Sequence, residues 1–112
     1  MFSLTSGLRY YLYARPTDMR KSFDGLCGLV SSRLGKNPRS GEVFIFINRR
    51  GDRMKLLHWE HGGFVLYYKR LESGTFEWPS GQGSLRQISW QELVMIVDGI
   101  VLKTVKKRRR FS

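Results

Sequence analysis

The first third of the chain contains a β-prone run followed by a helical pattern. Residues Arg9–Arg15 (RYYLYAR) are rich in tyrosine and predict a short strand. Over the next stretch, apolar residues recur mostly three or four positions apart, which predicts a helix at about 18–34. Thr17 or Asp18 would supply the N-cap oxygen of this helix, and Gly35 would adopt the left-handed conformation that ends it.

The middle third predicts three strands joined by tight turns. Residues Glu42–Asn48 (EVFIFIN) are apolar at successive positions, so we expect a central strand that is covered on both faces. Two further strands are predicted at Arg53–Trp59 and Phe64–Leu71. The connections Arg49–Asp52 and Glu60–Gly63 are short, and strands joined in this way are antiparallel neighbours.

The last third predicts one more strand and a second helix. Residues Leu85–Ile88 favour a short strand. Ser89 and Glu92 have the spacing of a capping box, and the apolar residues after them predict a short helix at about 90–98. The last ten residues have no apolar period. We therefore expect one domain over residues 1–102 and a basic tail over residues 103–112, without regular structure after about residue 103.

Together these elements predict an α+β fold. A small, mainly antiparallel sheet of about four strands would pack against one longer and one short helix. The length agrees, because 112 residues with 41% hydrophobic content make one domain with a small core. The pattern fixes neither the order of the strands nor the oligomeric state.

Charge adds the first indication of function. The 20 lysines and arginines and nine acidic residues give a net charge of +11, so we expect a polyanion such as DNA as partner. The tail contributes six basic residues and no acidic one: Lys103, Lys106, Lys107, Arg108, Arg109 and Arg110. Without them the chain still carries an excess of five positive charges. The tail is typical of a non-specific nucleic-acid arm, or alternatively of a solvated tail that favours solubility.

A second basic group surrounds the first predicted hairpin. In an antiparallel meander, the start of the second strand and the end of the third lie at the same edge of the sheet. Six basic residues are therefore expected along one rim: Arg49, Arg50, Arg53, Lys55, Lys69 and Arg70. A two-stranded ribbon with such a tip can enter the major groove or straddle phosphates. Alternatively, these charges discourage edge-to-edge aggregation.

Aromatic residues are interleaved with these charges, in an arrangement that single-strand binding proteins use for base stacking. They are Trp59, Phe64, Tyr67, Tyr68, Phe76 and Trp78. In a sheet this small, most of them are needed for the core. We therefore interpret the set as core residues.

Signals for catalysis or cofactor binding are weak. His58, Glu60 and His61 are close in sequence, but a zinc site needs three or four converging ligands and no further strong ligand is near. The acidic residues form no evident pair for a two-metal nuclease. Cys27 lies on the apolar face of the predicted helix, where an inert thiol is expected. We therefore expect no enzyme activity, no cofactor and no metal.

The sequence also bears on the compartment. The longest apolar runs, such as Val43–Ile47, are too short to cross a bilayer, and the first residues lack the features of a signal peptide. A single cysteine forms no internal disulfide. We expect a cytoplasmic protein without membrane contact.

Several motifs, taken in order, are characteristic of one family. The chain closely resembles the TnpB-type accessory protein of the insertion-sequence-sixty-six family, the product of the second open reading frame of such elements. The motifs that carry the resemblance are Tyr11-Leu12-Tyr13, Pro16–Lys21 with Phe23–Leu26, Val43-Phe44, Asn48-Arg49-Arg50, Asp52-Arg53, Lys55–Leu57, Trp59-Glu60, Gly63-Phe64, Tyr68–Glu72, Gly74, Phe76 and Trp78-Pro79.

The resemblance implies a role in transposition. Such elements encode a separate, larger transposase with a DDE catalytic core, together with small accessory proteins, and the family carries no assigned catalytic residues. The expected partners are DNA, the transposase and the other accessory protein, in the bacterial cytoplasm and at the nucleoid when DNA is bound. The leading hypothesis is a DNA-binding factor at the element ends. The alternative is an interaction module that docks on the transposase, and a third is a nuclease that uses Asp18, Asp24 or Asp52.

Overall fold

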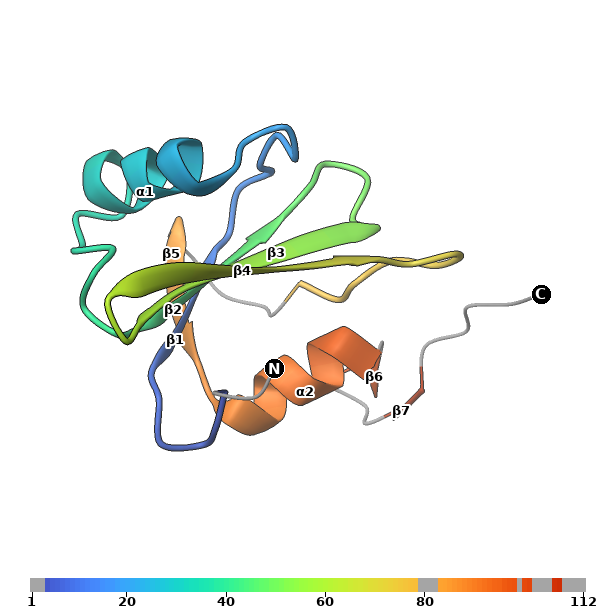
Figure 1. Ribbon diagram of the computed structural model, residues 1–112. Coiled ribbons are helices and arrows are strands. Elements are labelled where there is room, and N and C mark those ends of the chain that lie inside the picture. The colour runs from blue at the N-terminus through green and yellow to red at the C-terminus, as the bar shows by residue number, and fades with distance from the viewer. Residues whose placement is uncertain (1–3, 79–82, 99, 102–105, 108–112) are drawn as a thin grey trace.

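A five-stranded sheet with a helix on each face forms the centre of the molecule (Figure 1). The computed structural model describes residues 4–78 and 83–98, and the short strand segments 100–101 and 106–107. Its elements are β1 (Tyr10–Tyr13), α1 (Phe23–Ser32), β2 (Val43–Ile47), β3 (Arg53–Glu60), β4 (Gly63–Arg70), β5 (Leu85–Ile88), α2 (Trp90–Asp98), β6 (Ile100–Val101) and β7 (Lys106–Lys107). The α+β class is therefore confirmed, and the sheet has five strands where about four were predicted.

The strand order is β4-β3-β2-β1-β5. Strands β2, β3 and β4 form the predicted antiparallel meander, and β5 runs antiparallel to β1. The pairing of β1 with β2 is parallel, with Tyr10 opposite Val43 and Leu12 opposite Ile45. The connection between these two strands contains α1, as parallel neighbours require. The carboxyl ends of β1 and β2 therefore point to the same end of the sheet.

Strand β2 is the middle strand, and all five of its side chains are buried, as predicted. Phe44 and Phe46 pack on one face of the sheet with Leu26 and Val30 of α1. On the other face, the alternate residues of β2 pack in the cluster that includes Leu93 of α2. Figure 1 shows α1 and α2 on opposite sides of the sheet. Each helix therefore covers one hydrophobic face.

The first helix is shorter than predicted. It begins at Phe23, and the predicted N-cap at Thr17 or Asp18 is wrong, because residues 17–22 form a loop. Ser22 occupies the N-cap position without a side-chain hydrogen bond to the helix. The end of the helix is closer to prediction. Gly35 has φ +63°, and the N–H of the next residue donates to Val30 O at 3.0 Å.

The turn between β3 and β4 and the start of α2 form as their local sequences predict. His61 (φ 49°) and Gly62 (φ 79°) form the two-residue turn between β3 and β4, with the positive φ values that such hairpins need. The predicted capping box is confirmed. Ser89 Oγ accepts the N–H of Glu92 at 3.0 Å, and Glu92 Oε1 accepts the N–H of Ser89 at 2.9 Å. No helix among the described residues is long and apolar enough to cross a membrane.

The basic tail differs from the expectation at one place. Lys106–Lys107 form the two-residue strand β7, which pairs antiparallel with Ile100–Val101. The other basic residues of the predicted tail, Lys103 and Arg108–Arg110, lie outside the described residues.

Candidate nucleic-acid interface

The parallel pairing of β1 and β2 brings two loops together at one end of the sheet. The loop after β1 and the turn after β2 line an open cleft of about 630 Å³. The backbone joins them directly, because the N–H of Thr17 donates to Ile47 O at 2.9 Å. Crevices outside the carboxyl ends of parallel strands are common ligand sites in open sheets. The charged residues that line this cleft are Arg20, Arg49, Arg50, Arg53, Asp18 and Asp52.

The turn after β2 is built to expose two arginines. Gly51 adopts φ +78°, and its N–H donates to Asn48 O at 3.0 Å. The Asn48 side chain bridges the turn, since its Nδ2 donates to Asp52 Oδ1 at 2.8 Å and its Oδ1 accepts the N–H of Arg53 at 3.0 Å. Arg49 and Arg50, between these anchors, are exposed. The turn therefore presents two adjacent guanidinium groups to solvent.

Asp52 contributes a carboxylate to the same turn. The hydrogen bond from Asn48 lowers the pKa of Asp52, although desolvation opposes it, and the charges of Arg50 and Arg53 lower it further. The carboxylate is therefore ionised at neutral pH, and the turn remains basic because Arg49, Arg50 and Arg53 outnumber it.

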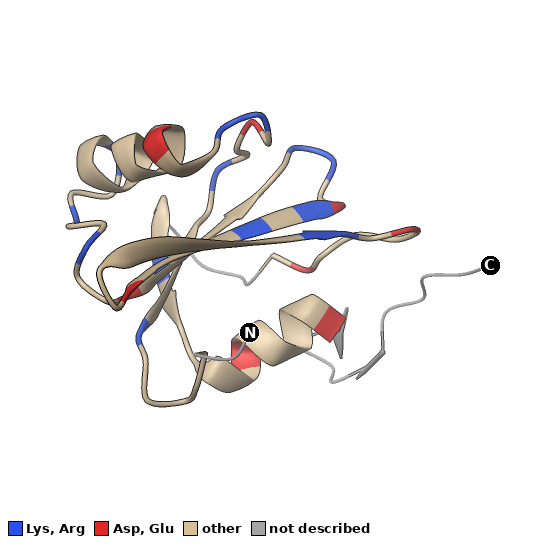
Figure 2. Cartoon of the chain, in the orientation of Figure 1, with Lys and Arg blue, Asp and Glu red and all other residues tan. Residues whose placement is uncertain are grey.

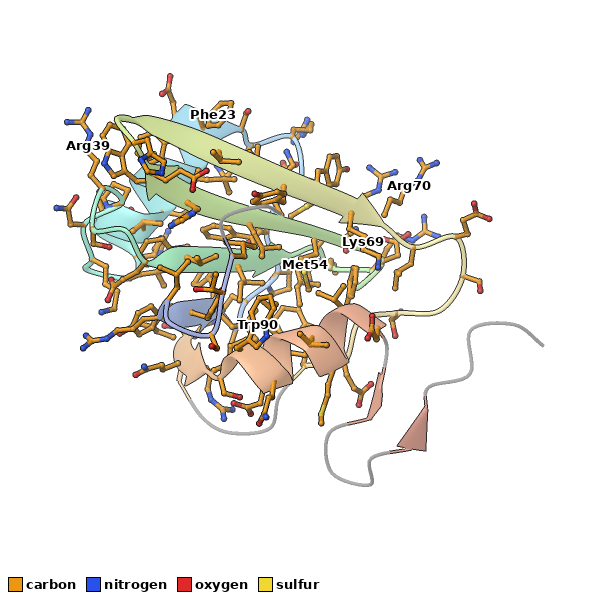
Figure 3. All side chains as sticks on the ribbon, turned by 60° about the horizontal axis from the view of Figure 1, so that its bottom comes forward. Phe23, Arg39, Met54, Lys69, Arg70 and Trp90 are labelled. Atoms are coloured by element: carbon orange, nitrogen blue, oxygen red, sulfur yellow. The ribbon has the colours of Figure 1, made fainter. Side chains whose placement is uncertain are left out.

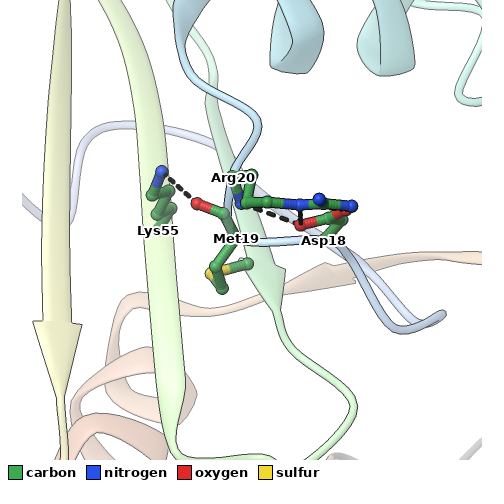
Figure 4. A network of polar contacts seen from close by, with 4 residues as sticks. All are labelled: Asp18, Met19, Arg20 and Lys55. Atoms are coloured by element: carbon green, nitrogen blue, oxygen red, sulfur yellow. Dashed lines mark hydrogen bonds and ion pairs between the residues drawn. The ribbon is translucent and has the colours of Figure 1, made fainter.

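The loop after β1 is shaped by Asp18. Its Oδ1 accepts the N–H of Arg20 at 2.9 Å, and its Oδ2 accepts Arg20 Nη2 at 2.7 Å (Figure 4). Chiefly through the hydrogen bonds from Arg20, the pKa of Asp18 is lowered to about 2. The Arg20 side chain remains 92% exposed. The loop thus holds an arginine at the cleft, with its charge partly balanced by Asp18.

Lys55 has a structural role in the fold, whereas the sequence placed it among the exposed cations of the rim. Its side chain is buried, and Nζ donates to Met19 O at 2.8 Å and to Lys21 O at 2.7 Å. Figure 4 shows the first of these bonds beside the Asp18–Arg20 pair. The ammonium group therefore fastens the loop after β1 onto β3, and we leave Lys55 out of the DNA-contacting set.

The other predicted hairpin residues do gather at this end of the sheet. Arg53 of β3 lies opposite Arg70 of β4, so both belong to the same sheet face as Lys55. Lys69 lies on the opposite face, where Nζ is 3.4 Å from Val97 O of α2. Figure 3 shows Lys69 and Arg70 together at the end of β4. The expected rim therefore exists, with its charges divided between two faces.

Charge at the other end of the molecule is more balanced (Figure 2). Lys36 lies 4.1 Å from the ring centroid of Tyr11, and Arg39 lies 5.2 Å from that of Trp59. Glu42 and Glu60 also lie at that end. The cations there are partly engaged with aromatic rings and accompanied by carboxylates, whereas four arginines and two aspartates line the cleft.

Most of the interleaved aromatic residues belong to the core, as we interpreted them. Phe76 is buried, and Trp59 and Phe64 are partly buried and pack edge to face with ring centroids 4.8 Å apart. Tyr68 is the exception, because 52% of it is exposed. Its hydroxyl accepts a hydrogen bond from Arg53 Nη1 at 3.4 Å, and Lys55 Nζ lies 4.8 Å from its ring centroid.

The apolar spacing predicts that Arg20 and Lys21 lie in the first helix, but both lie in the loop after β1, and Arg20 lines the cleft. The available signal was the strand–helix–strand order of 9–48, which is typical of a parallel crossover and places the loops after both strands at one end. Thr17 also lines this cleft, and its hydroxyl oxygen Oγ1 is buried without a hydrogen-bond partner in the structure.

The histidine, cysteine and aspartate side chains considered for catalysis or metal binding lie in different surroundings. In the part of the chain that the structure describes, no three His, Cys, Asp or Glu residues are grouped to hold a metal. His58 Nε2 is 3.1 Å from Gly41 O and Nδ1 is 3.7 Å from Glu60. Burial, with the charge of Asp24, raises the pKa of the Cys27 thiol. Asp18 and Asp52 do line one cleft, but Asp24 is on α1.

Comparison with known proteins finds a matching family model and similar proteins. A family model described as "IS66 Orf2 like protein" matches residues 8–107. The chain is 33% identical to the uncharacterized protein y4jC of Sinorhizobium fredii over 96% of its own length and 92% of the relative. It is 36% identical to the uncharacterized protein y4hO of the same organism over 83% of its length and 81% of the relative. No solved structure gives a significant match.

Proposed function

The chain belongs to the IS66 Orf2-like family, and on that premise we propose that it is a non-catalytic accessory protein that binds DNA at the ends of an insertion sequence. The family suggests an accessory role in insertion-sequence transposition. The DNA contact and the assistance of a separate DDE transposase are our proposals. The observation that carries them is the convergence of arginines from two loops and two strands at one end of the sheet.

Phosphate binding explains the composition of this end. Arginine forms bidentate hydrogen bonds with phosphate oxygens and keeps its charge at all relevant pH values. Arg49 and Arg50 are exposed on the turn that Asn48 bridges, and Arg53 and Arg70 lie opposite each other on adjacent strands. We propose that these four form the main phosphate-contacting set, together with Arg20 and Lys21 from the neighbouring loop. Lys69 and the basic tail, Lys106 to Arg110, would add non-specific attraction.

The turn is also the part best suited to sequence recognition. A pair of hydrogen bonds from arginine to the N7 and O6 atoms of guanine is the commonest base-specific contact in the major groove. Arg49 and Arg50 lie on the exposed turn between β2 and β3, two inner strands of the five-stranded sheet, so this turn would meet the groove as part of the sheet end and not as a free ribbon. Phosphate contacts would supply affinity, and these two residues would supply any preference for end sequences.

A direct test compares binding to element-end DNA and scrambled duplex DNA. The proteins are the full chain, a chain that ends at Leu102, and full-length Arg49→Ala/Arg50→Ala. A matched control, Arg9→Ala/Arg33→Ala, removes the same charge from exposed residues outside the cleft. We expect the turn variant to lose more affinity than the control. Equal losses in the two variants would contradict the assignment of the interface.

A second candidate function is docking on the transposase, and the position of β4 favours it. Strand β4 is an edge strand of eight residues in the sheet order, and an edge is the position at which another chain can add a strand. A complex held by such pairing persists at high salt, where phosphate contacts fail. Co-purification with the transposase at high salt would support docking, and its absence would count against it.

A further inference from the structure

Tyr68 is exposed where burial would be expected. Among the described residues, it is the most exposed of the large apolar and aromatic side chains, at 52%. On the same face of β4, the preceding alternate residues Phe64 and Leu66 are partly buried against the sheet core. Core packing therefore does not account for the position of this ring. A large exposed aromatic side chain on a rigid strand is typical of a contact surface.

The ring has two cationic neighbours that limit its movement. Lys55 Nζ lies 4.8 Å from its centroid, and this ammonium is itself fixed by the carbonyls of Met19 and Lys21. Arg53 Nη1 donates to the Tyr68 hydroxyl at 3.4 Å. One part of the ring is therefore backed by cations, while the rest faces solvent. A ring ordered in this way loses little conformational freedom when a ligand stacks on it.

The surroundings of the ring are cationic. Arg70 is two residues along β4 on the same face, and Arg53 lies opposite it on β3. The loop that Lys55 fastens carries Arg20 and Lys21. The acidic residue on this loop, Asp18, is engaged by Arg20. An aromatic ring among cations fits a ligand that combines a flat π-face with phosphates, as each nucleotide of a DNA strand does.

The exposure of the base decides which form of DNA fits. In a duplex, both faces of a base are covered by its neighbours, and only edges are accessible in the grooves. We propose that Tyr68 stacks on an unpaired base of single-stranded DNA while Arg53 and Arg70 bind the adjoining phosphates. This inference rests on the proposed DNA-binding function and names the form of DNA that one part of the interface takes.

The test measures binding of full-length variants to a labelled oligothymidylate, which forms no duplex, and to a labelled hairpin duplex. We expect Tyr68→Ala to weaken oligothymidylate binding at least about fivefold, since one stacked base contributes this much or more. Duplex binding should change less than about twofold. Tyr68→Phe, which keeps the ring, should bind both probes like the unsubstituted chain. Phe23→Ala removes the aromatic side chain on α1, which is the other exposed one among the described residues, and serves as the control with no expected effect.

The outcomes separate this inference from the function on which it rests. If neither probe binds the unsubstituted chain, the proposed function fails. If the duplex binds but Tyr68→Ala leaves oligothymidylate binding unchanged, stacking is wrong and DNA binding stands. Equal losses on both probes, or a loss with Tyr68→Phe as large as with Tyr68→Ala, would also overturn stacking. Loss of transposase binding with unchanged DNA binding would instead assign the ring to a protein contact.

Discussion

Single polar side chains at the cleft organise backbone and charge at the same time. Asp18 accepts a backbone N–H and the guanidinium of Arg20, and Asn48 bridges the turn that carries Arg49 and Arg50. Each anchor fixes the chain next to an arginine. The arginines are therefore presented by ordered loops, which lowers the entropic cost of binding an anion.

The Asp18–Arg20 pair predicts a specific pH dependence of stability. Because Arg20 lowers the pKa of Asp18 from 3.8 to about 2, the ionised carboxylate stabilises the folded chain above about pH 4, and this contribution is lost as the pH falls to about 2. Asp18→Asn should therefore melt at a lower temperature than the unsubstituted chain at neutral pH. The difference should be small, because the pair is exposed, and should close between about pH 4 and 2. A difference that does not change with pH would contradict this role.

Gly51 predicts an effect on the turn itself. Its φ of +78° is unfavourable for other residues, and a Cβ would lie 3.3 Å from Thr75 Cβ. Gly51→Ala should cost about 1–2 kcal/mol in the free energy of unfolding, measured by urea denaturation. Gly28 is the matched control, because it lies within α1 with open space around it. Gly28→Ala should stabilise the chain by about 0.5–1 kcal/mol. Similar effects of the two substitutions would refute the strained turn.

At the scale of elements, features that depend on neighbouring residues were predictable from the sequence, and features that depend on contacts between distant residues were not. The capping box of α2, the central position of β2 and the glycine after α1 follow from neighbouring residues, and all agree with the sequence. The start of α1 does not, because the apolar spacing continues back to Met19. In the structure, Met19 lies in the loop, because Lys55, 36 residues away, donates a hydrogen bond to the carbonyl oxygen of Met19. Such a contact leaves no periodic trace in the sequence.

The position of Lys55 predicts that this one residue holds the loop after β1. Lys55→Met removes two charge-assisted hydrogen bonds and should lower the free energy of unfolding by about 2 kcal/mol or more. It should also speed trypsin cleavage after Arg20 and Lys21 in the folded protein, because the loop is released from β3. Lys69→Met, on the exposed end of β4, should change stability by less than about 0.5 kcal/mol. Unchanged cleavage in Lys55→Met would show that other contacts hold the loop.

At the scale of the whole molecule, the topology makes the site. Arg20 and Arg49 are far apart in sequence and meet because β1 and β2 are parallel neighbours. The hairpin alone predicted the rim of Arg53 and Arg70, since antiparallel pairing brings these positions together. The contribution of the first loop depends on the parallel pairing of β1 and β2, which the strand–helix–strand order favours but the hydrophobic pattern alone does not fix. The division of charges between the two sheet faces follows from the alternation of side chains along β4, which places the neighbouring residues Lys69 and Arg70 on opposite sides.

The salt dependence of duplex binding tests the central claim most directly. Each phosphate contact adds about 0.9 to the slope of log affinity against log salt concentration. Full-length Arg49→Ala/Arg50→Ala should therefore reduce the magnitude of this slope by about 2 relative to the unsubstituted chain. Arg9→Ala/Arg33→Ala should leave the slope unchanged. If the turn variant and the control have the same slope as the unsubstituted chain, the arginine turn does not contact DNA and the proposed interface is wrong.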